Sequence, residues 1–341
     1  MCASSCGTDG KYSVVVPALR KDSVGTSWKT PVTGDETIPI SKFYLAKPVD
    51  SAATINAQLA AGKHLMFTPG VYHVTESINI NRANTVVMGL GLATITADQG
   101  AVAFRIADVD GVKMSGLLID AGLVESPVLV EVGPVGSRAN HSVNPTSLSD
   151  VYFRIGGNFS GQAKSSIVIN SNDVIGDHFW VWRADHDGQA LPVTWADNKS
   201  TNGLIVNGND VTLYGMFVEH HNEYQTIWNG NGGRLYFYQS EMPYEMPTQA
   251  SWMNGTSNGW ASYKVADSVS THEAWGLGIY SVALTNPLVK ASTAIEAPAK
   301  PGIKFHNMTT VGISGEITHI INGRGDGVYT EGKFSLARLA E

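Results

Sequence analysis

Hydrophobic and polar positions repeat with a fixed spacing in the middle of the chain. Residues 205–209 read Ile-Val-Asn-Gly-Asn, and 22 residues later residues 227–231 read Ile-Trp-Asn-Gly-Asn. The same spacing places Glu219 opposite Glu241. Between these points Val, Ile, Tyr and Phe are frequent and stop at Asn-Gly or Gly-Gly pairs, which favours strands and turns over helices. A repeat of this length predicts stacked units that each bury an apolar face against the next.

These units predict an all-β fold, namely a right-handed parallel β-helix of the pectin-lyase-like solenoid type. One unit would form one rung, and neighbouring rungs would lie about 4.8 Å apart. Glu219 and Glu241 should therefore be neighbours in one column on one face. We expect residues 46–341 to form this domain and residues 1–45 to be a lead-in or linker segment.

A capping helix is predicted near the N-terminal end of the solenoid. Residues 50–62 begin with Asp or Ser as the N-cap, continue with an Ala-rich body and stop at Gly62. The apolar residues of this helix should cover the first rung, because the end of a solenoid must be capped. Rungs should follow from Thr85 onwards, with long loops near 187–202 and 243–262.

The column of the two glutamates extends to earlier rungs. Aligning the Asn-Asp-Val segments that start the rungs gives the column Asp120, Trp182, Glu219 and Glu241. Trp180 shares a face with Trp182, because alternate residues of a strand point the same way. Flat aromatic side chains of this kind suit the stacking of sugar rings. The aromatic residues expected around the carboxylates are Trp180, Trp182, Trp195, Trp228, Tyr236, Tyr238, Tyr244 and Trp252.

Composition and charge exclude several classes of protein. The chain has 341 residues and a formal net charge of −7, which gives no electrostatic basis for binding nucleic acid. No apolar run is long enough to cross a membrane. Neither the histidines nor the two cysteines, Cys2 and Cys6, show the spacing of a metal site, so no metal and no cofactor are expected. The segment with the cysteines is too short and polar for a signal peptide, and a non-native start is the preferred interpretation. The alternatives are a disulfide between Cys2 and Cys6 or a metal site completed by ligands from elsewhere.

Two neighbouring carboxyl groups can cleave a glycosidic bond. One gives a proton to the leaving oxygen and the other serves the attacking water or the sugar. Glu241 precedes Met-Pro-Tyr and should lie at a pocket rim near Tyr244, where lost hydration would raise its pKa and favour the role of acid. Glu219 precedes His-His-Asn, a wetter setting that should leave it ionised and able to orient water. The alternative is that both are solvated positions of a repeated surface.

The residues around this column resemble glycoside hydrolase family 55, the exo-β-1,3-glucanases or laminarinases. The similarity runs from about Tyr12 to the C-terminus. The segments that carry it are residues 180–186, 217–220, 227–230, 240–244 and 272–276. The resemblance implies an inverting glycosidase that releases glucose from the non-reducing end of β-1,3-glucan, and a secreted protein.

The resemblance also implies roles for individual residues. Glu241 matches the general acid of the family, Glu219 the carboxylate that helps hold the attacking water, and Tyr244 the Tyr three residues after the acid. Members of the family carry two β-helices in one chain, and this sequence resembles the second, so the first would be a partner missing here. The residues expected to bind substrate are Trp180, Trp182, Asp185, His186, Trp228 and Trp252.

Two other functions fit the same predicted fold. A pectin-type lyase or polygalacturonase would need Ca²⁺ with basic residues, or an Asp cluster, whereas this column is acidic and aromatic. A carbohydrate-binding or structural solenoid without activity would keep the aromatic surface and lack a complete water site. Binding of laminarin without hydrolysis would identify the latter.

Overall fold

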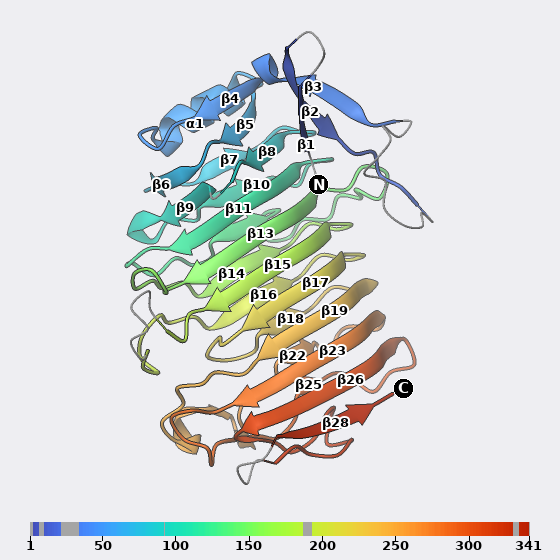
Figure 1. Cartoon of the computed structure of the whole chain (residues 1–341). Coiled ribbons are helices and arrows are strands. Elements are labelled where there is room, and N and C mark those ends of the chain that lie inside the picture. The colour runs from blue at the N-terminus through green and yellow to red at the C-terminus, as the bar shows by residue number, and fades with distance from the viewer. Residues whose placement is uncertain are drawn as a thin grey trace.

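The chain folds into a stack of parallel strands that runs from its N-terminal to its C-terminal part (Figure 1). The computed structural model describes residues 3–6, 10–21, 34–91, 93–186, 193–329 and 334–340. Short strands of one sheet alternate along the sequence with long strands of another, and the neighbours in each sheet pair in parallel over most of the stack. The prediction of a parallel β-helix is therefore confirmed.

Two sheets form the walls of the solenoid. In spatial order, the short-strand sheet contains β25 (Ile295–Glu296), β22 (Tyr263–Val265), β18 (Thr226–Trp228), β16 (Asn202–Val206), β14 (Ser165–Ile169), β12 (Val130–Val132), β10 (Phe104–Ile106) and β7 (Ile78–Ile80). The large sheet contains β28 (Ser335–Leu339), β26 (Ile303–Ser314), β23 (His272–Val282), β19 (Gly233–Glu241), β17 (Thr212–Glu219), β15 (Ile175–Arg183), β13 (Ser147–Ile155), β11 (Lys113–Ala121), β8 (Val86–Gly89), β5 (His64–Phe67) and β4 (Phe43–Ala46), with β6 (Gly70–Val74) and β9 (Ala93–Ala97) beside this path. Smaller pairs are β20 (Met253–Asn254) with β21 (Ser257–Asn258) and β24 (Lys290–Ala291) with β27 (Glu316–Ile317).

The core lies between the inner faces of these sheets. Alternate residues point inward, so Met216 and Val218 of β17 are buried, as are Leu277 and Ile279 of β23. Burial of each such side chain contributes about 1.5–3 kcal/mol. The residues that alternate with them point outward: Phe217 lies between Met216 and Val218, and Glu219 follows Val218 at the end of β17.

One residue in each long strand adopts a left-handed backbone, and these residues lie in register down the large sheet. Their φ angles lie between +53° and +70°. Asn, Asp, His and Gly tolerate this conformation, whereas it strains a bulky residue such as Phe237. The strands pair in parallel on both sides of this row. Its members are Gly116, Asp150, His178, Gly215, Phe237, Gly276 and Asn307.

The N-terminal end of the stack is covered as predicted. Helix α1 (Ala52–Ala60) begins at the N-cap Ser51, whose side chain accepts a hydrogen bond from the Thr54 N–H. It buries Ile55 and Leu59 and contacts β7, β4 and β5 (Figure 1). Strand β4, which spans the expected boundary at residues 45 and 46, already pairs with β5.

A small antiparallel sheet of β1 (Ala3–Cys6), β2 (Tyr12–Val16) and β3 (Glu36–Pro39) also lies at this end. Its residues Val14, Val16 and Ile38 pack with side chains of the first rungs of the large sheet. Cys2 lies outside the described residues.

The predicted loops hold little regular structure. The described part of residues 243–262 contains a short 3-10 helix, Gln249–Ser251, and the hairpin β20–β21. Residues 187–192 of the other predicted loop lie outside the described residues. Within the described residues no helix is long and apolar enough to span a membrane.

A buried histidine, His141, stabilises the connection between β12 and β13 through hydrogen bonds to three aspartates. His141 Nδ1 lies 2.7 Å from Asp110 Oδ1, and its Nε2 lies 2.9 Å from Asp108 Oδ1. The His141 N–H donates to Asp173 Oδ2 at 2.8 Å. Burial alone would lower the pKa of His141, but the hydrogen bonds to Asp110 and Asp108 outweigh burial and raise it. The charged imidazole therefore stabilises the folded chain.

We expect His141→Gln to lower the free energy of unfolding by about 2 kcal/mol at pH 5.5, since hydrogen bonds to charged groups are lost. The folded-state pKa is raised, so the contribution of His141 is complete below the unfolded-state pKa and declines as pH rises through the folded-state pKa. Urea unfolding at pH 5.5 and pH 9 measures this difference. His73→Gln, which removes an exposed pair with Asp98, is the control and should change stability little. An equal deficit of the His141 variant at both pH values would contradict the assignment.

Candidate active site

The predicted column of side chains exists on the outer face of the large sheet. Backbone register pairs Asp120 with Arg154, Arg154 with Trp182, and Trp182 with Glu219. Strands β17 and β19 are neighbours, paired up to Phe217 and Gln239 with the 22-residue offset that the sequence predicts. The His220 N–H donates to the Glu241 carbonyl at 3.0 Å, which continues the same register to the two glutamates. Glu219 and Glu241 therefore end adjacent strands on one face.

Glu219 is nearly enclosed. Its side chain is 9% exposed, and the indole Nε1 of Trp180 donates to its Oε2 at 2.7 Å. Loss of hydration raises the pKa of Glu219, and the indole hydrogen bond and the charge of His220 offset only part of this. The expectation of a wet setting for Glu219 is therefore wrong, because Trp180 covers the carboxyl group.

Glu241 is held by several donors. Tyr244 donates its hydroxyl proton to Oε2, and Gln239 Nε2 donates to Oε1 at 3.1 Å. His220 Nε2 lies 3.4 Å from Glu241 Oε2. The hydrogen bond with His220 lowers the pKa of Glu241, helped by the one from Tyr244, and together they outweigh burial. The expectation of a raised pKa for Glu241 is thus wrong, because hydrogen bonding to the charged form outweighs lost hydration.

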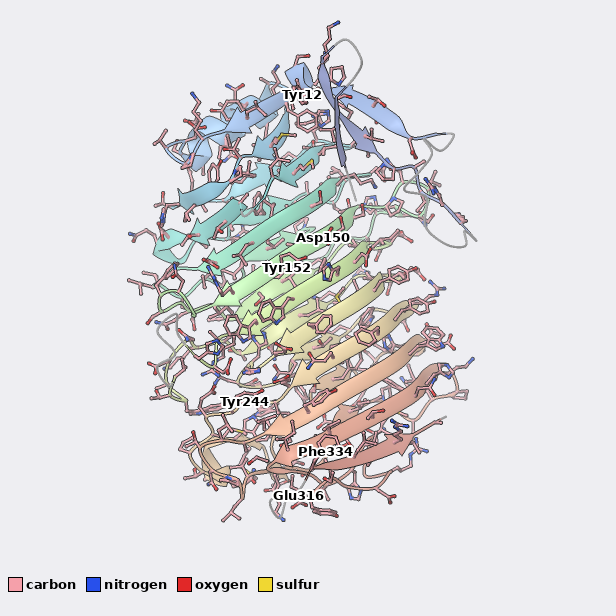
Figure 2. The ribbon with its side chains drawn as sticks, viewed as in Figure 1. Tyr12, Asp150, Tyr152, Tyr244, Glu316 and Phe334 are labelled. Atoms are coloured by element: carbon pink, nitrogen blue, oxygen red, sulfur yellow. The ribbon has the colours of Figure 1, made fainter. Side chains whose placement is uncertain are left out.

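Tyr244 and the glutamates lie together as the sequence predicts. Figure 2 shows Tyr244 beside the ends of the strands and Tyr152 on a rung nearer the N-terminal end of the stack. Burial and the hydrogen bond to Glu241 raise the pKa of Tyr244, so its hydroxyl keeps its proton and acts as a donor.

Four of the residues predicted to bind substrate, Trp180, Trp182, Asp185 and His186, form a group beside Glu219. The rings of Trp180 and Trp182 stack with centroids 5.0 Å apart, and Trp180 remains 42% exposed. Trp182 Nε1 donates to Asp185 Oδ1 at 3.2 Å, and the ring of His186 lies 5.3 Å from that of Trp182. These side chains give the site one aromatic wall that carries a carboxylate.

A groove of about 500 Å³ begins at this aromatic wall. It is lined by Trp180, Trp182, Tyr152, Arg154 and residues 116–118, so it crosses β11, β13 and β15. Arg154 is held by Asp120 through two hydrogen bonds of 2.9 and 2.7 Å. Neither glutamate lines this groove, but Trp180, which does, donates a hydrogen bond to Glu219. The groove therefore extends from the Glu219 side of the site towards the N-terminal rungs.

Two of the predicted substrate-binding residues are core residues. Trp228 is fully buried in the short-strand sheet, where its ring packs 4.6 Å from that of His272. Trp252 is 2% exposed, and its Nε1 donates to the Asn222 carbonyl. Neither ring has a free face for a sugar. The prediction of substrate binding by Trp228 and Trp252 is therefore wrong.

A buried arginine, Arg183, holds together the segments around the site through hydrogen bonds. The sequence did not predict this role. Arg183 is fully buried and forms an ion pair with Glu245 at 2.9 Å. Its guanidinium also donates to the carbonyls of Asn198, Asp197 and His220 at 2.9 to 3.1 Å. Three segments that follow β15, β17 and β19 thus meet at one cation. The sequence places His220 only as part of the polar setting of Glu219 and does not mark Gln239, although both lie close to predicted site residues.

The described residues contain no cluster of three or more His, Cys, Asp and Glu side chains that could hold a metal ion. The site brings together the carboxyl groups of Glu219, Glu241 and Asp185, the imidazole of His220 and the phenol of Tyr244.

Comparison with known proteins places this geometry in a family. A family model described as the LAM55 pectate lyase-like domain matches residues 43–241. An exo-beta-1,3-glucanase of Streptomyces sp. (strain SirexAA-E / ActE) is 50% identical over 317 residues, which cover 92% of this chain and 52% of that protein. A glucan 1,3-beta-glucosidase of Cochliobolus carbonum is 25% identical over 253 residues, 66% of this chain and 32% of that protein.

The fold matches a solved structure along almost its whole length. The structure of sacteLam55A from Streptomyces sp. SirexAA-E superposes with a TM-score of 0.95 and 46% identity, covering 99% of this chain and 62% of that one. A Glu-to-Ala variant of sacteLam55A in complex with glucose matches equally well. The chain spans about half the length of the 50% identical relative. With this match of family model, sequence and fold, the chain belongs to glycoside hydrolase family 55, through its LAM55 pectate-lyase-like domain.

Proposed function

We propose that this chain carries the hydrolytic site of a β-1,3-glucanase. The observation that carries the proposal is the pair Glu219 and Glu241, which end adjacent strands on one outer face beside an aromatic wall. Carboxyl groups on neighbouring strands are close enough to flank one glycosidic bond. The names of the two relatives, an exo-beta-1,3-glucanase and a glucan 1,3-beta-glucosidase, support this choice of substrate.

In the proposed reaction a glucan chain lies in the groove with its terminal sugar against Trp180 and Trp182. Glu241 gives a proton to the leaving oxygen, and Glu219 orients the water that attacks the sugar from the other side. The donors Tyr244 and Gln239 then stabilise the carboxylate that forms on Glu241. Release of glucose from the non-reducing end, inversion at the anomeric carbon and action outside the cell are parts of the same proposal.

Incubation with laminarin tests the proposal directly. We expect release of glucose, with the α-anomer appearing first in a proton NMR time course because inversion converts the β-linkage, and no release of reducing sugar from polygalacturonate. Glu241→Gln should remove the activity. Glu273→Gln, on β23 of the same sheet, is the matched control and should keep it. Binding of laminarin without hydrolysis would contradict the proposal and identify a non-catalytic binding solenoid.

A further inference from the structure

His220 has an unusual setting beside the two carboxylates. It directly follows β17, and its backbone is left-handed, with φ of +68°. The Arg183 guanidinium donates to its carbonyl at 3.1 Å, and its own N–H donates to the Glu241 carbonyl at 3.0 Å. The side chain is 3% exposed. The imidazole is therefore fixed in position and withdrawn from solvent.

Both ring nitrogens of His220 face carboxylates. Nε2 lies 3.4 Å from Glu241 Oε2, and Nδ1 lies 3.7 Å from Asp185 Oδ1. Nδ1 has no hydrogen-bond partner among the described residues. The ring also packs on Tyr244, with centroids 4.3 Å apart. An imidazole between two carboxylates can carry a proton on either nitrogen and pass one to its neighbour.

This setting addresses a conflict in the proposed mechanism. A general acid must hold a proton at the working pH, yet the hydrogen bond with His220 lowers the pKa of Glu241. His220 Nε2 and Glu241 Oε2 are in direct contact, and protons leave such a pair in steps that belong to neither residue alone. His220 and Glu241 together can hold two such protons, so the pair still carries one after the first has left.

We propose that His220 is a positioning residue that shares with Glu241 the proton needed by the leaving oxygen, and that Asp185 stabilises the charged imidazole. The inference rests on the proposed function. The Nε2–H bond of His220 breaks as the Oε2–H bond of Glu241 forms. That proton then moves to the glycosidic oxygen as its bond to the anomeric carbon breaks. His220 is left neutral and Glu241 is left ionised. The attacking water gives one proton to Glu219 as its oxygen bonds to the anomeric carbon. Glu219 then releases that proton to solvent, and the His220–Glu241 pair takes up one proton before the next turnover.

The charged and titratable groups around His220 come from every segment that packs on it. They are Asp185 after β15, Glu219 on β17, the adjacent His221, Glu241 on β19 and Tyr244 beyond it, with the Arg183–Glu245 ion pair behind its carbonyl. Arg183 is bound to Glu245, so its charge is balanced locally. The carboxyl groups of Asp185 and Glu241 face its two ring nitrogens.

The test replaces His220 by Asn, which tolerates the left-handed backbone. Two measurements should move in opposite directions. The ¹³C chemical shift of the Glu241 carboxyl should titrate at higher pH in His220→Asn, because a favourable hydrogen bond is lost. The alkaline limb of kcat/KM on laminarin should move to lower pH by about one unit or more, which is at least a tenfold loss at a fixed pH above the limb. A purely structural role of His220 would not separate the two.

His178→Asn is the matched control. His178 has φ of +59° in the row of left-handed residues, and its ring pairs with Asp150 and Tyr152 away from the glutamates. Both measurements should stay at their wild-type values in this variant. If both measurements move to higher pH in His220→Asn, or if the Glu241 titration does not move, the shared proton is refuted. If the wild-type chain does not hydrolyse laminarin, the proposed function fails, and the carboxyl titration still decides whether His220 and Glu241 are coupled.

Discussion

Glu241→Gln is expected to lower kcat/KM on laminarin by about 10²–10⁴-fold, the usual contribution of a general acid. On an aryl β-glucoside with an activated leaving group the loss should be much smaller, because such a group departs with little help from a proton. Glu219→Gln should reduce both rates alike, since water attacks in both reactions. Steady-state kinetics of the two variants on the two substrates measure the difference.

The same kinetic comparison decides which of Glu219 and Glu241 is the general acid and which orients the attacking water. In the free chain burial raises the pKa of Glu219 and hydrogen bonding lowers that of Glu241, which taken alone would make Glu219 the proton donor. If Glu219→Gln spares the aryl glucoside and Glu241→Gln does not, the roles are exchanged. Equal losses in all four measurements would contradict both assignments. Glu273→Gln again provides the control.

Arg183→Met should lower the free energy of unfolding by about 3–5 kcal/mol, because it leaves the buried carboxylate of Glu245 without its counterion. The same variant removes the donor to the His220 carbonyl and should lower activity on laminarin. Denaturant unfolding at neutral pH, paired with a laminarin assay, measures both effects.

A second substitution separates the charge from the packing. Glu245→Met added to Arg183→Met removes the stranded carboxylate, so the double variant should be more stable than Arg183→Met alone. It should stay below wild type, because the carbonyls of Asn198 and Asp197 still lack their donor. Arg105→Met breaks a partly exposed pair with Glu131 and should have little effect. Equal stability of Arg183→Met and wild type would refute the role of this ion pair.

The fold and the column of site residues could be predicted because both depend on spacing. A repeat of 22 residues fixes which side chains of neighbouring rungs face each other, and the register of β17 and β19 follows it. Between Asp120 and Trp182 the column also contains Arg154, which the sequence did not place there and which pairs with Asp120. The position of Arg154 could not be predicted from the sequence, because β13 is not separated from its neighbours β11 and β15 by the 22-residue repeat.

Other features depend on contacts that spacing does not determine. Trp228 belongs to a three-residue strand, too short for a pattern to show which face is buried. The pKa of Glu241 depends on the ring of His220, whose direction is set by a left-handed backbone that no local motif marks. The ion pair of Arg183 and Glu245 joins residues 62 apart through two irregular segments. In each case the deciding neighbour comes from another part of the chain.

The place of the site within the stack has a consequence for local opening. Rungs contact only their neighbours, so a solenoid frays from its ends and its middle opens last. The site lies on β15, β17 and β19, with β23, β26 and β28 on one side and β13, β11, β8, β5 and β4 on the other. Loss of a terminal rung therefore leaves the facing carboxylates in register, and the amide protons of these three strands should be among the last to exchange with deuterium.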